Sequence, residues 1–305
     1  MIRVFGFAHG ASSSFLRAMI VFGLLGAVGC TAGGGVVDVT SDPSIDSDKL
    51  ALAVAARSED DRARDGARNP QETLDFFEVE SDMKVLEVLP GSGWYTRVLA
   101  PYLSDGGELH GVMYAHEMLP MFGFFSDERI AAVKKQMAEW QDFLTQSGGV
   151  GVTGQGASFG RAPDSWDQHF DRIVMIRALH NLNRFEAKAG TRTAALAQIH
   201  RWLKPDGTVG VVQHRAPENA DDNWAAGQNG YLKRSAVIAM FEEAGFELFA
   251  ESSINANPLD RPEAGDYVWR LPPSLRGHES ESSKQQAQAI GESDRMTLVF
   301  RKRAN

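Results

Sequence analysis

The chain has 305 residues, of which 43% are hydrophobic, 9% aromatic and 23% charged. This composition is typical of a globular protein and excludes collagen, a coiled coil and a wholly disordered chain. Lys and Arg number 31 against 40 Asp and Glu, which gives a net charge of −9. An acidic chain without a basic cluster is unsuited to nucleic acid, so we expect no nucleic-acid partner.

The N-terminus has the layout of an export signal. Residues 1–17 contain two arginines and no acidic residue, and residues 18–29 form an uninterrupted apolar and small-residue stretch that ends just before Cys30. This stretch is short for a membrane span and typical of a secretory signal. Residues 25–30 also resemble a bacterial lipobox, with Ala27 at the place where leucine is usual.

Cys30 is the sole cysteine of the sequence, so an intramolecular disulfide is excluded. We predict that residues 1–29 are a lipoprotein-type signal peptide and that Cys30 carries the lipid. The protein would then be an exported cell-envelope lipoprotein, at the periplasmic or outer-membrane face. A simple secretory peptide with an incidental cysteine and a retained membrane anchor are the alternatives. Residues 30–48 are rich in Gly, Ser and Asp, which predicts a flexible tether.

Residues 49–305 form one predicted α/β domain. At its start we predict a charged helix over 49–68 and a short helix that begins at Pro70. Apolar residues at helical spacing predict further helices at 95–102, 127–144, 191–203 and 235–244. Short runs of apolar and β-branched residues predict strands at 84–89, 108–114, 170–176, 208–213, 246–254 and 296–301. This alternation predicts a Rossmann-like, doubly wound, mostly parallel sheet with helices on both faces.

Ligands of a doubly wound sheet bind beyond the carboxyl ends of its strands. The strand at 84–89 is followed at once by a turn that contains Pro90, Gly91 and Gly93, and then by a helix. Glycine lets the backbone approach a ligand closely, and the first turn of a helix offers free N–H groups. The turn therefore predicts a ligand site. A segment at about 255–292 is long enough to cover this edge as a lid.

Polar side chains follow two further strands. His180 and Asn181 come shortly after one of them, and His214 and Arg215 come directly after the other. Each histidine is a candidate general base, and Arg215 is a candidate partner for a substrate carboxylate or phosphate. The alternatives are structural hydrogen bonds for the histidines and an ion pair with a neighbouring Asp for Arg215.

Metal-ligand spacing is not evident in the sequence. The histidines His110, His169, His200 and His278 share no such spacing, and the HExxH motif does not occur. We therefore predict no metal site. A GxSxG nucleophile motif does not occur either, which disfavours a serine hydrolase.

The segment from Glu87 to Gly93 resembles the first motif of class I S-adenosylmethionine-dependent methyltransferases, an acid followed by a glycine turn, with Leu89 in place of the first glycine. The chain resembles more closely a bacterial family of methyltransferase-like proteins that are often exported. This second resemblance covers about residues 57–303. Its blocks are 90–96, 99–102, 177–181, 203–207, 211–216, 254–258 and 291–296.

The resemblance implies a seven-stranded sheet with S-adenosylmethionine as the cofactor. It implies cofactor contacts for Glu87, Pro90, Gly91, Gly93, Tyr95, Met113 and Asn181. Met113 ends the second strand, where these enzymes usually carry an acid that binds the ribose hydroxyls, and Glu117 is the nearest replacement. With His180, His214 and Arg215 as catalytic residues, we expect a methyltransferase of the envelope that acts on a small molecule or an envelope component.

The alternative function is a non-catalytic or repurposed Rossmann-like ligand-binding lipoprotein, which the departures at Leu89 and Met113 favour. The methyl acceptor and the oligomeric state are open at this stage. The membrane partner is expected only through the lipid on Cys30.

Overall fold

The computed structural model describes residues 43–304. The predicted signal peptide, Cys30 and most of the predicted tether lie outside these residues. Helix α1 spans Pro43–Ala55, so the last residues that we assigned to the tether, 43–48, are helical. Within residues 43–304, none of the helices is long and apolar enough to cross a membrane.

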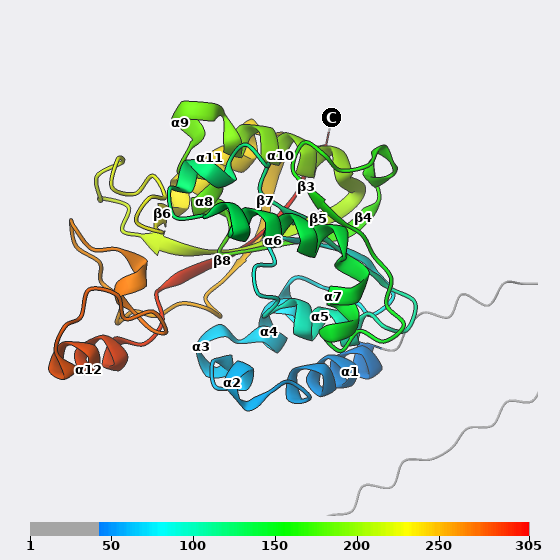
Figure 1. Ribbon diagram of the computed structural model, residues 1–305, viewed down its shortest axis with the longest axis horizontal. Coiled ribbons are helices and arrows are strands. Elements are labelled where there is room, and N and C mark those ends of the chain that lie inside the picture. The colour runs from blue at the N-terminus through cyan, green and yellow to red at the C-terminus, as the bar shows by residue number, and fades with distance from the viewer. Residues whose placement is uncertain (1–42, 305) are drawn as a thin grey trace, which may run out of the picture. The chain divides into compact units, whose positions relative to one another are not determined.

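Seven strands lie side by side in one mixed sheet, in the order β3-β2-β1-β4-β5-β8-β7 (Figure 1). The strands are β1 Lys84–Val88, β2 Glu108–Met113, β3 Gly156–Ser158, β4 Phe170–Ile176, β5 Leu203–Ala216, β7 Phe246–Ser252 and β8 Arg295–Lys302. All pairs from β3 to β5 are parallel, whereas β8 is antiparallel to both β5 and β7. A short strand, β6 (Leu232–Lys233), pairs with the end of β5. This strand order is typical of the methyltransferase Rossmann-like fold, so the predicted fold class is confirmed.

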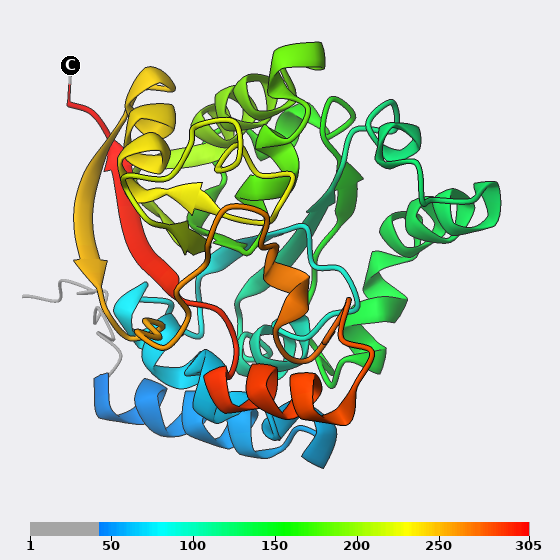
Figure 2. The ribbon, with the colours of Figure 1, turned by 90° about the vertical axis from the view of Figure 1, so that its left-hand side faces the viewer.

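Helices cover both faces of the sheet, as Figures 1 and 2 show. One layer holds α1, α4 (Pro70–Phe76), α5 (Thr96–Tyr102) and α7 (Trp140–Gln146). The opposite layer holds α8 (Leu179–Asn183), α10 (Thr191–Trp202) and α11 (Arg234–Glu243). The remaining helices are α2 Glu59–Arg62, α3 Asp65–Arg68, α6 Asp127–Ala138, α9 Glu186–Ala189 and α12 Glu281–Ile290, with 3-10 turns η1 Leu119–Phe122, η2 Asp164–Trp166 and η3 Val268–Arg270.

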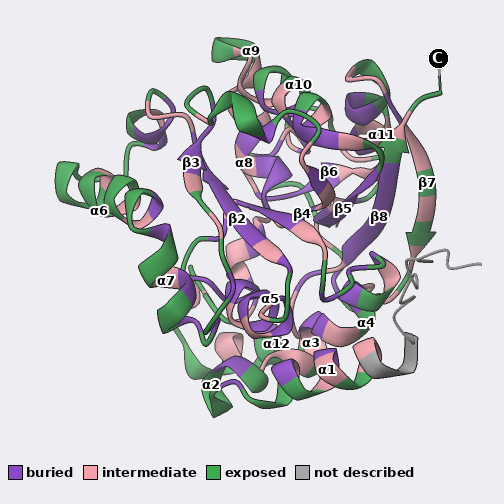
Figure 3. Ribbon diagram, turned by 90° about the vertical axis from the view of Figure 1, so that its right-hand side faces the viewer, coloured by how far each residue is buried: buried purple, intermediate pink, exposed green. Residues whose placement is uncertain are grey.

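The central strands are buried on both faces (Figure 3). Because side chains alternate between the faces of a strand, a strand buried on both faces must be apolar along its length. Val85 and Leu86 of β1 and Ile173 and Met175 of β4 are all completely buried. The register pairs Val88 with Met175, so the carboxyl ends of β1 and β4 lie next to each other. The loops that leave these strands therefore meet at one edge of the sheet.

Candidate active site

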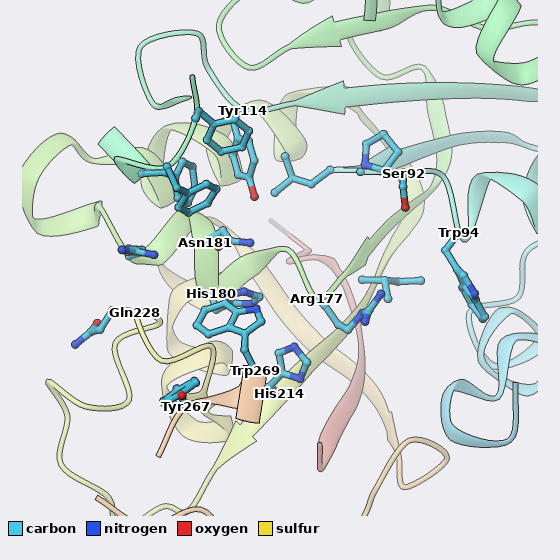
Figure 4. Close-up of a pocket in the computed structure, with 18 of the residues that line it drawn as sticks. Ser92, Trp94, Tyr114, Arg177, His180, Asn181, His214, Gln228, Tyr267 and Trp269 are labelled. Atoms are coloured by element: carbon cyan, nitrogen blue, oxygen red, sulfur yellow. The ribbon is translucent and has the colours of Figure 1, made fainter. Parts of the chain in front are cut away.

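A cavity of about 940 Å³ lies at the carboxyl edge of the sheet, between the loops that follow β1 and β4. Figure 4 shows Ser92 and Tyr114 on one side of it and Asn181, His180 and Trp269 on the other. This is the edge at which the doubly wound topology predicts a ligand.

The loop after β1 keeps a backbone that favours glycine, although it begins with leucine. Leu89, Gly91 and Gly93 have φ angles of 56°, 59° and 81°. A Cβ on Gly91 would meet one atom within 4 Å, the carbonyl oxygen of Leu89 at 3.9 Å, so Gly91 faces open space in the cavity. A Cβ on Gly93 would lie 2.6 Å from Cζ of Phe143 on α7. Gly91 is therefore placed for a ligand, and Gly93 is required for packing.

Glu87 lies behind this loop. The Glu87 side chain is buried, and its Oε2 accepts a hydrogen bond of 2.6 Å from Oγ1 of Thr96. Burial raises the pKa of Glu87 to about 7, although the hydrogen bond from Thr96 opposes the rise. The contact joins β1 to the first turn of α5. Glu87 thus holds the loop in place and does not line the cavity.

His180 and His214 meet at the floor of the cavity, with ring centroids 5.4 Å apart (Figure 4). Nδ1 of His180 lies 3.2 Å from Oε1 of Gln213, and Nδ1 of His214 lies 2.6 Å from Oγ of Ser293. Burial lowers the pKa of His180 to about 4 and holds the pKa of His214 well below its usual value. Both rings are therefore neutral at physiological pH.

The tautomer of His180 follows from the contacts of Gln213. Nε2 of Gln213 donates to the carbonyl oxygens of His214 and Gly230, at 3.2 and 2.8 Å. Oε1 of Gln213 is therefore the acceptor, and Nδ1 of His180 must carry the proton. The lone pair of His180 is then on Nε2, to which no described residue bonds. A neutral imidazole in this tautomer can accept a proton.

Met113, at the end of β2, and Glu117, after it, do not lie where the resemblance to methyltransferases places a cofactor. Met113 is buried in the core, and Glu117 is exposed and paired with Arg161 at 2.7 Å, so neither lines the cavity. The cavity instead receives Tyr114, whose hydroxyl points into it (Figure 4). Burial raises the pKa of Tyr114, so its hydroxyl is a neutral donor and acceptor.

Half of the ten predicted site residues line the cavity, namely Pro90, Gly91, Asn181, His180 and His214. Arg215 is turned away and forms a bidentate ion pair with Asp294, at 2.7 and 3.0 Å. Tyr95 is buried, and its hydroxyl donates to the carbonyl oxygen of Arg68 at 3.4 Å. Arg215 therefore takes the ion-pair alternative that the sequence left open.

The segment predicted as a lid contributes directly to the cavity wall. Tyr267, Trp269 and Arg276 come from it, and Trp269 packs against His180 with ring centroids 6.1 Å apart. The segment also contains η3 and α12, so part of it is helical.

The arginines of the cavity were not predicted from the sequence. Six of them line it: Arg64, Arg68, Arg129, Arg177, Arg184 and Arg276. Among the described residues, the lining includes no Asp or Glu. These arginines come from five separate segments, so no local motif reveals them. The available signals were Arg177, which directly follows a buried strand, and Arg276, which belongs to the predicted lid segment.

A second cluster lies at the opposite, amino edge of the sheet. Oε2 of Glu108 is 3.0 Å from Nε2 of His110 and 2.9 Å from Nε2 of His169. The three ligand atoms lie within 4.8 Å of one another, so two histidines without shared sequence spacing do come together around a carboxylate. However, Nδ1 of His110 accepts from the N–H of Gln155 at 3.2 Å, which places the proton on Nε2. Lys84 also pairs with Glu108 at 2.9 Å. The contacts are those of an ion-pair network.

Fold and site together define a doubly wound α/β protein with one large, arginine-lined cavity at the carboxyl edge of its sheet. No protein-family model matches the sequence, and no curated protein matches it.

Similar solved structures include an S-adenosylmethionine-dependent methyltransferase from Aquifex aeolicus, with 16% identity over 68% of this chain and 93% of that chain and a TM-score of 0.45. The [4+2]-cyclase SpnF has 16% identity over 78% of this chain and 81% of that chain, with a TM-score of 0.48. The 1,6-didemethyltoxoflavin-N1-methyltransferase of Burkholderia thailandensis, solved with S-adenosylhomocysteine, has 12% identity over 85% of this chain and 88% of that chain, with a TM-score of 0.44. Each likeness concerns the fold, which the strand order of this chain establishes by itself.

Proposed function

We propose that this protein is an S-adenosylmethionine-dependent methyltransferase of the cell envelope, acting on a small molecule or an envelope component. One observation carries the proposal: an open glycine loop and a neutral histidine with a free Nε2 face the same cavity at the carboxyl edge of the sheet. The loop suits a cofactor, and the histidine suits an acceptor that must lose a proton.

The residues of the cavity fit this cofactor in most respects. A volume of about 940 Å³ accommodates the cofactor and an acceptor together. The backbone at Gly91 lets a ligand approach without meeting a side chain. No carboxylate among the described lining residues is available for ribose hydroxyls, and the hydroxyl of Tyr114 takes that place. The fit therefore rests on backbone and aromatic groups rather than on an acid.

The bound cofactor would supply a methyl group on a sulfonium sulfur, open to in-line displacement by a nucleophilic atom. The protein then has to position the acceptor and accept its proton. Gln213 fixes the ring of His180, so that Nε2 receives the proton. Trp269 packs edge-on against the ring of His180, with ring centroids 6.1 Å apart.

Calorimetric titration with S-adenosylmethionine and S-adenosylhomocysteine tests the proposal. Gly91→Arg fills the open space above the loop, whereas Gly190→Arg is a matched control. Gly190 has the same φ of 59°, and a Cβ on Gly190 would meet no other atom within 4 Å. Gly190 does not line the cavity. We expect binding to wild type and to Gly190→Arg and loss of binding in Gly91→Arg. Absence of binding to wild type at millimolar ligand would overturn the proposal.

A second candidate function is favoured by the charge of the cavity. Six arginines and no acid among the described lining residues suit an anionic ligand better than a sulfonium cation. On this basis the protein would be a ligand-binding lipoprotein that retains the fold without methyl transfer. The same titration separates the candidates, because this one predicts no heat with either cofactor form.

The envelope location is part of the proposal and depends on the N-terminal sequence, with residues 1–29 as the signal peptide and Cys30 as the lipidated residue. S-adenosylmethionine is made in the cytoplasm, so an exported enzyme needs a supply of it outside. The location is therefore best tested separately from the chemistry.

A further inference from the structure

The cavity concentrates positive charge in a chain whose net charge is −9. Arginine is always charged at physiological pH and forms paired hydrogen bonds to carboxylate or phosphate oxygens. Six arginines around one cavity, with no acid among its described lining residues, therefore create a local field of the opposite sign to the molecule.

Among the six arginines, Arg177 gives the clearest indication of an anionic ligand. It directly follows β4 and has a φ of 56°, in the left-handed region that a non-glycine residue seldom adopts. Among residues 43–304, its guanidinium has neither an ion-pair partner nor a hydrogen-bond acceptor, and its Nε is fully buried. Burial lowers the pKa of Arg177 to about 10, which leaves the group charged at neutral pH. A buried charge without a partner is costly to a fold unless something binds it.

Neighbouring arginines leave no spare carboxylate for Arg177. Arg64, Arg68 and Arg295 all pair with Glu292, at 2.6, 3.4 and 3.4 Å. Three guanidinium groups thus share one carboxylate, and Arg177 adds a fourth positive charge that has no ion-pair partner among residues 43–304. This end of the cavity therefore has an excess of positive charge, which an anionic ligand would balance.

The outer part of the cavity is aromatic. Phe122, Phe124 and Phe125 line it, and their ring centroids lie 4.8 to 5.6 Å apart. Phe124 is 57% exposed, which is unusual for a large apolar side chain. Arg184 lies over the ring of Phe122 at 5.8 Å. This part suits a flat or apolar body attached to an anionic group.

We propose that the substrate of this site is an apolar or aromatic molecule with a carboxylate or phosphate group, and that Arg177 binds the anionic group. In naming a methyl acceptor, the inference rests on the proposed function. The anionic group lies against the guanidinium of Arg177, the apolar body lies against the three phenylalanines, and the reacting atom is brought to the floor where His180 lies.

Binding of defined probes to the full chain in a non-ionic detergent tests the inference. Benzoate and phenyl phosphate carry the two kinds of anion, inorganic phosphate lacks the apolar body, and benzamide is the neutral analogue. We expect one or both aromatic anions to bind, inorganic phosphate to bind more weakly, and benzamide not to bind. The preferred anion identifies the substrate class. Equal binding of benzamide would overturn the inference.

Two matched arginine substitutions sharpen the test. Arg177→Gln removes the unpartnered guanidinium. Arg172→Gln removes an arginine of β4, the strand just before Arg177, whose Nε donates to the carbonyl oxygens of Phe77 and Glu78. We expect Arg177→Gln to weaken anion binding by about 10- to 100-fold and Arg172→Gln to leave it unchanged. Wild-type anion binding in Arg177→Gln would contradict the inference.

The melting temperature without ligand supplies a second readout. Because Nε of Arg177 is buried and no described residue accepts a hydrogen bond from it, Arg177→Gln should raise the melting temperature, by roughly 2 to 4 °C. Arg172→Gln should lower it, because two carbonyl oxygens lose their donor. A merely structural role for Arg177 would instead make Arg177→Gln less stable, which would overturn the inference.

Saturation with S-adenosylhomocysteine distinguishes this inference from the proposed function. If the cofactor binds and leaves anion affinity intact, both stand. If it displaces the anion, Arg177 binds the carboxylate of the cofactor and the inference fails. If anions bind but the cofactor does not, the anion site stands and the methyltransferase proposal fails.

Discussion

Leu89 adopts a backbone conformation that is strained for leucine. Its φ of 56° is the value that glycine adopts readily, and the methyltransferase motif that this segment resembles has glycine there. The turn thus has at Leu89 a backbone conformation that suits glycine, although the residue is leucine. The resemblance indicated that Leu89 replaces a glycine, whereas the positive φ of Leu89 was visible only in the structure.

At most positions an alanine variant is more stable than a glycine variant, and replacing Leu89 should reverse this order of stability. Both changes remove the side chain, but only glycine relieves the backbone strain, so Leu89→Gly should be more stable than Leu89→Ala by about 1 kcal/mol. Ile176, at the end of β4 and also in the cavity wall, is the control, because its φ is not positive and alanine should be the better replacement. Urea unfolding measures both pairs. The same order at both positions would contradict the assigned strain.

The burial of His180 predicts the pH at which its ring takes up a proton. Its pKa of about 4 means that the ring is neutral above about pH 5 and gains a proton only in acid. Because the folded pKa lies below the unfolded value, the stability that this group contributes is present above its unfolded pKa and is lost as pH falls. NMR titration of the ring protons, with His180→Gln to assign the signal, measures the pKa. Titration near 6.5 would show that the ring is solvated and would contradict its burial.

At the scale of elements, the register of the strands brings together residues whose contact the sequence does not reveal. The example is the cluster of Glu108, His110 and His169. Glu108 and His110 begin β2, and His169 immediately precedes β4, with β1 between these strands. Nothing in the spacing of two histidines so far apart indicates contact. They meet because the amino ends of β2, β1 and β4 are aligned in a parallel sheet.

The same network predicts acid sensitivity. Burial would raise the pKa of Glu108, but hydrogen bonds from Lys84, His110 and His169 outweigh it and lower the pKa to about 2. The stability linked to Glu108 is therefore present above about pH 4.5 and is lost as pH falls toward 2. Glu108→Gln should reduce stability at pH 7 by on the order of 1 to 3 kcal/mol and flatten the pH dependence between these values. Urea unfolding at several pH values measures it, and an unchanged slope would contradict the network.

Strand prediction succeeded where helix boundaries did not. The predicted strands at 84–89, 108–114 and 170–176 correspond to β1, β2 and β4, because buried parallel strands are continuous apolar runs. The short edge strand β3 was missed because it lies in a glycine-rich connection. The helix predicted over 49–68 is three helices, α1, α2 and α3, because Ser58 caps a new start and Asp65 begins another. The helix predicted over 127–144 ends at Ala138 and a second begins at Trp140.

At the scale of the whole molecule, the residues of the candidate site were predictable only in part. Strand exits identified His180, His214 and the glycine turn, since topology fixes where such residues meet. The cationic lining was not predictable, because its arginines come from α2–α3, α6, the end of β4, the end of α8 and the segment after η3. Their convergence depends on tertiary packing. For the same reason the sequence did not show that Arg215 is turned away from the cavity: its ion-pair partner, Asp294, is distant in sequence.

The predicted lipid anchor would determine where the whole molecule is located. Cys30→Ser should move the protein from the membrane fraction to the soluble fraction, because it removes the residue that is predicted to be lipidated. Fractionation with mass spectrometry of the N-terminal peptide measures the change. Retention of Cys30→Ser in the membrane would favour a retained anchor, and an unmodified Cys30 in soluble wild type would favour a simple secretory peptide.

The most direct test of the central claim is a crystal structure of the protein with S-adenosylhomocysteine. We expect the ligand above Gly91, with its ribose in hydrogen-bonding distance of the Tyr114 hydroxyl, and with the space between Arg177 and His180 left for an acceptor. A cavity that stays without this ligand at saturating concentration, or a ligand bound elsewhere on the protein, would contradict the claim that this cavity is the active site of a methyltransferase.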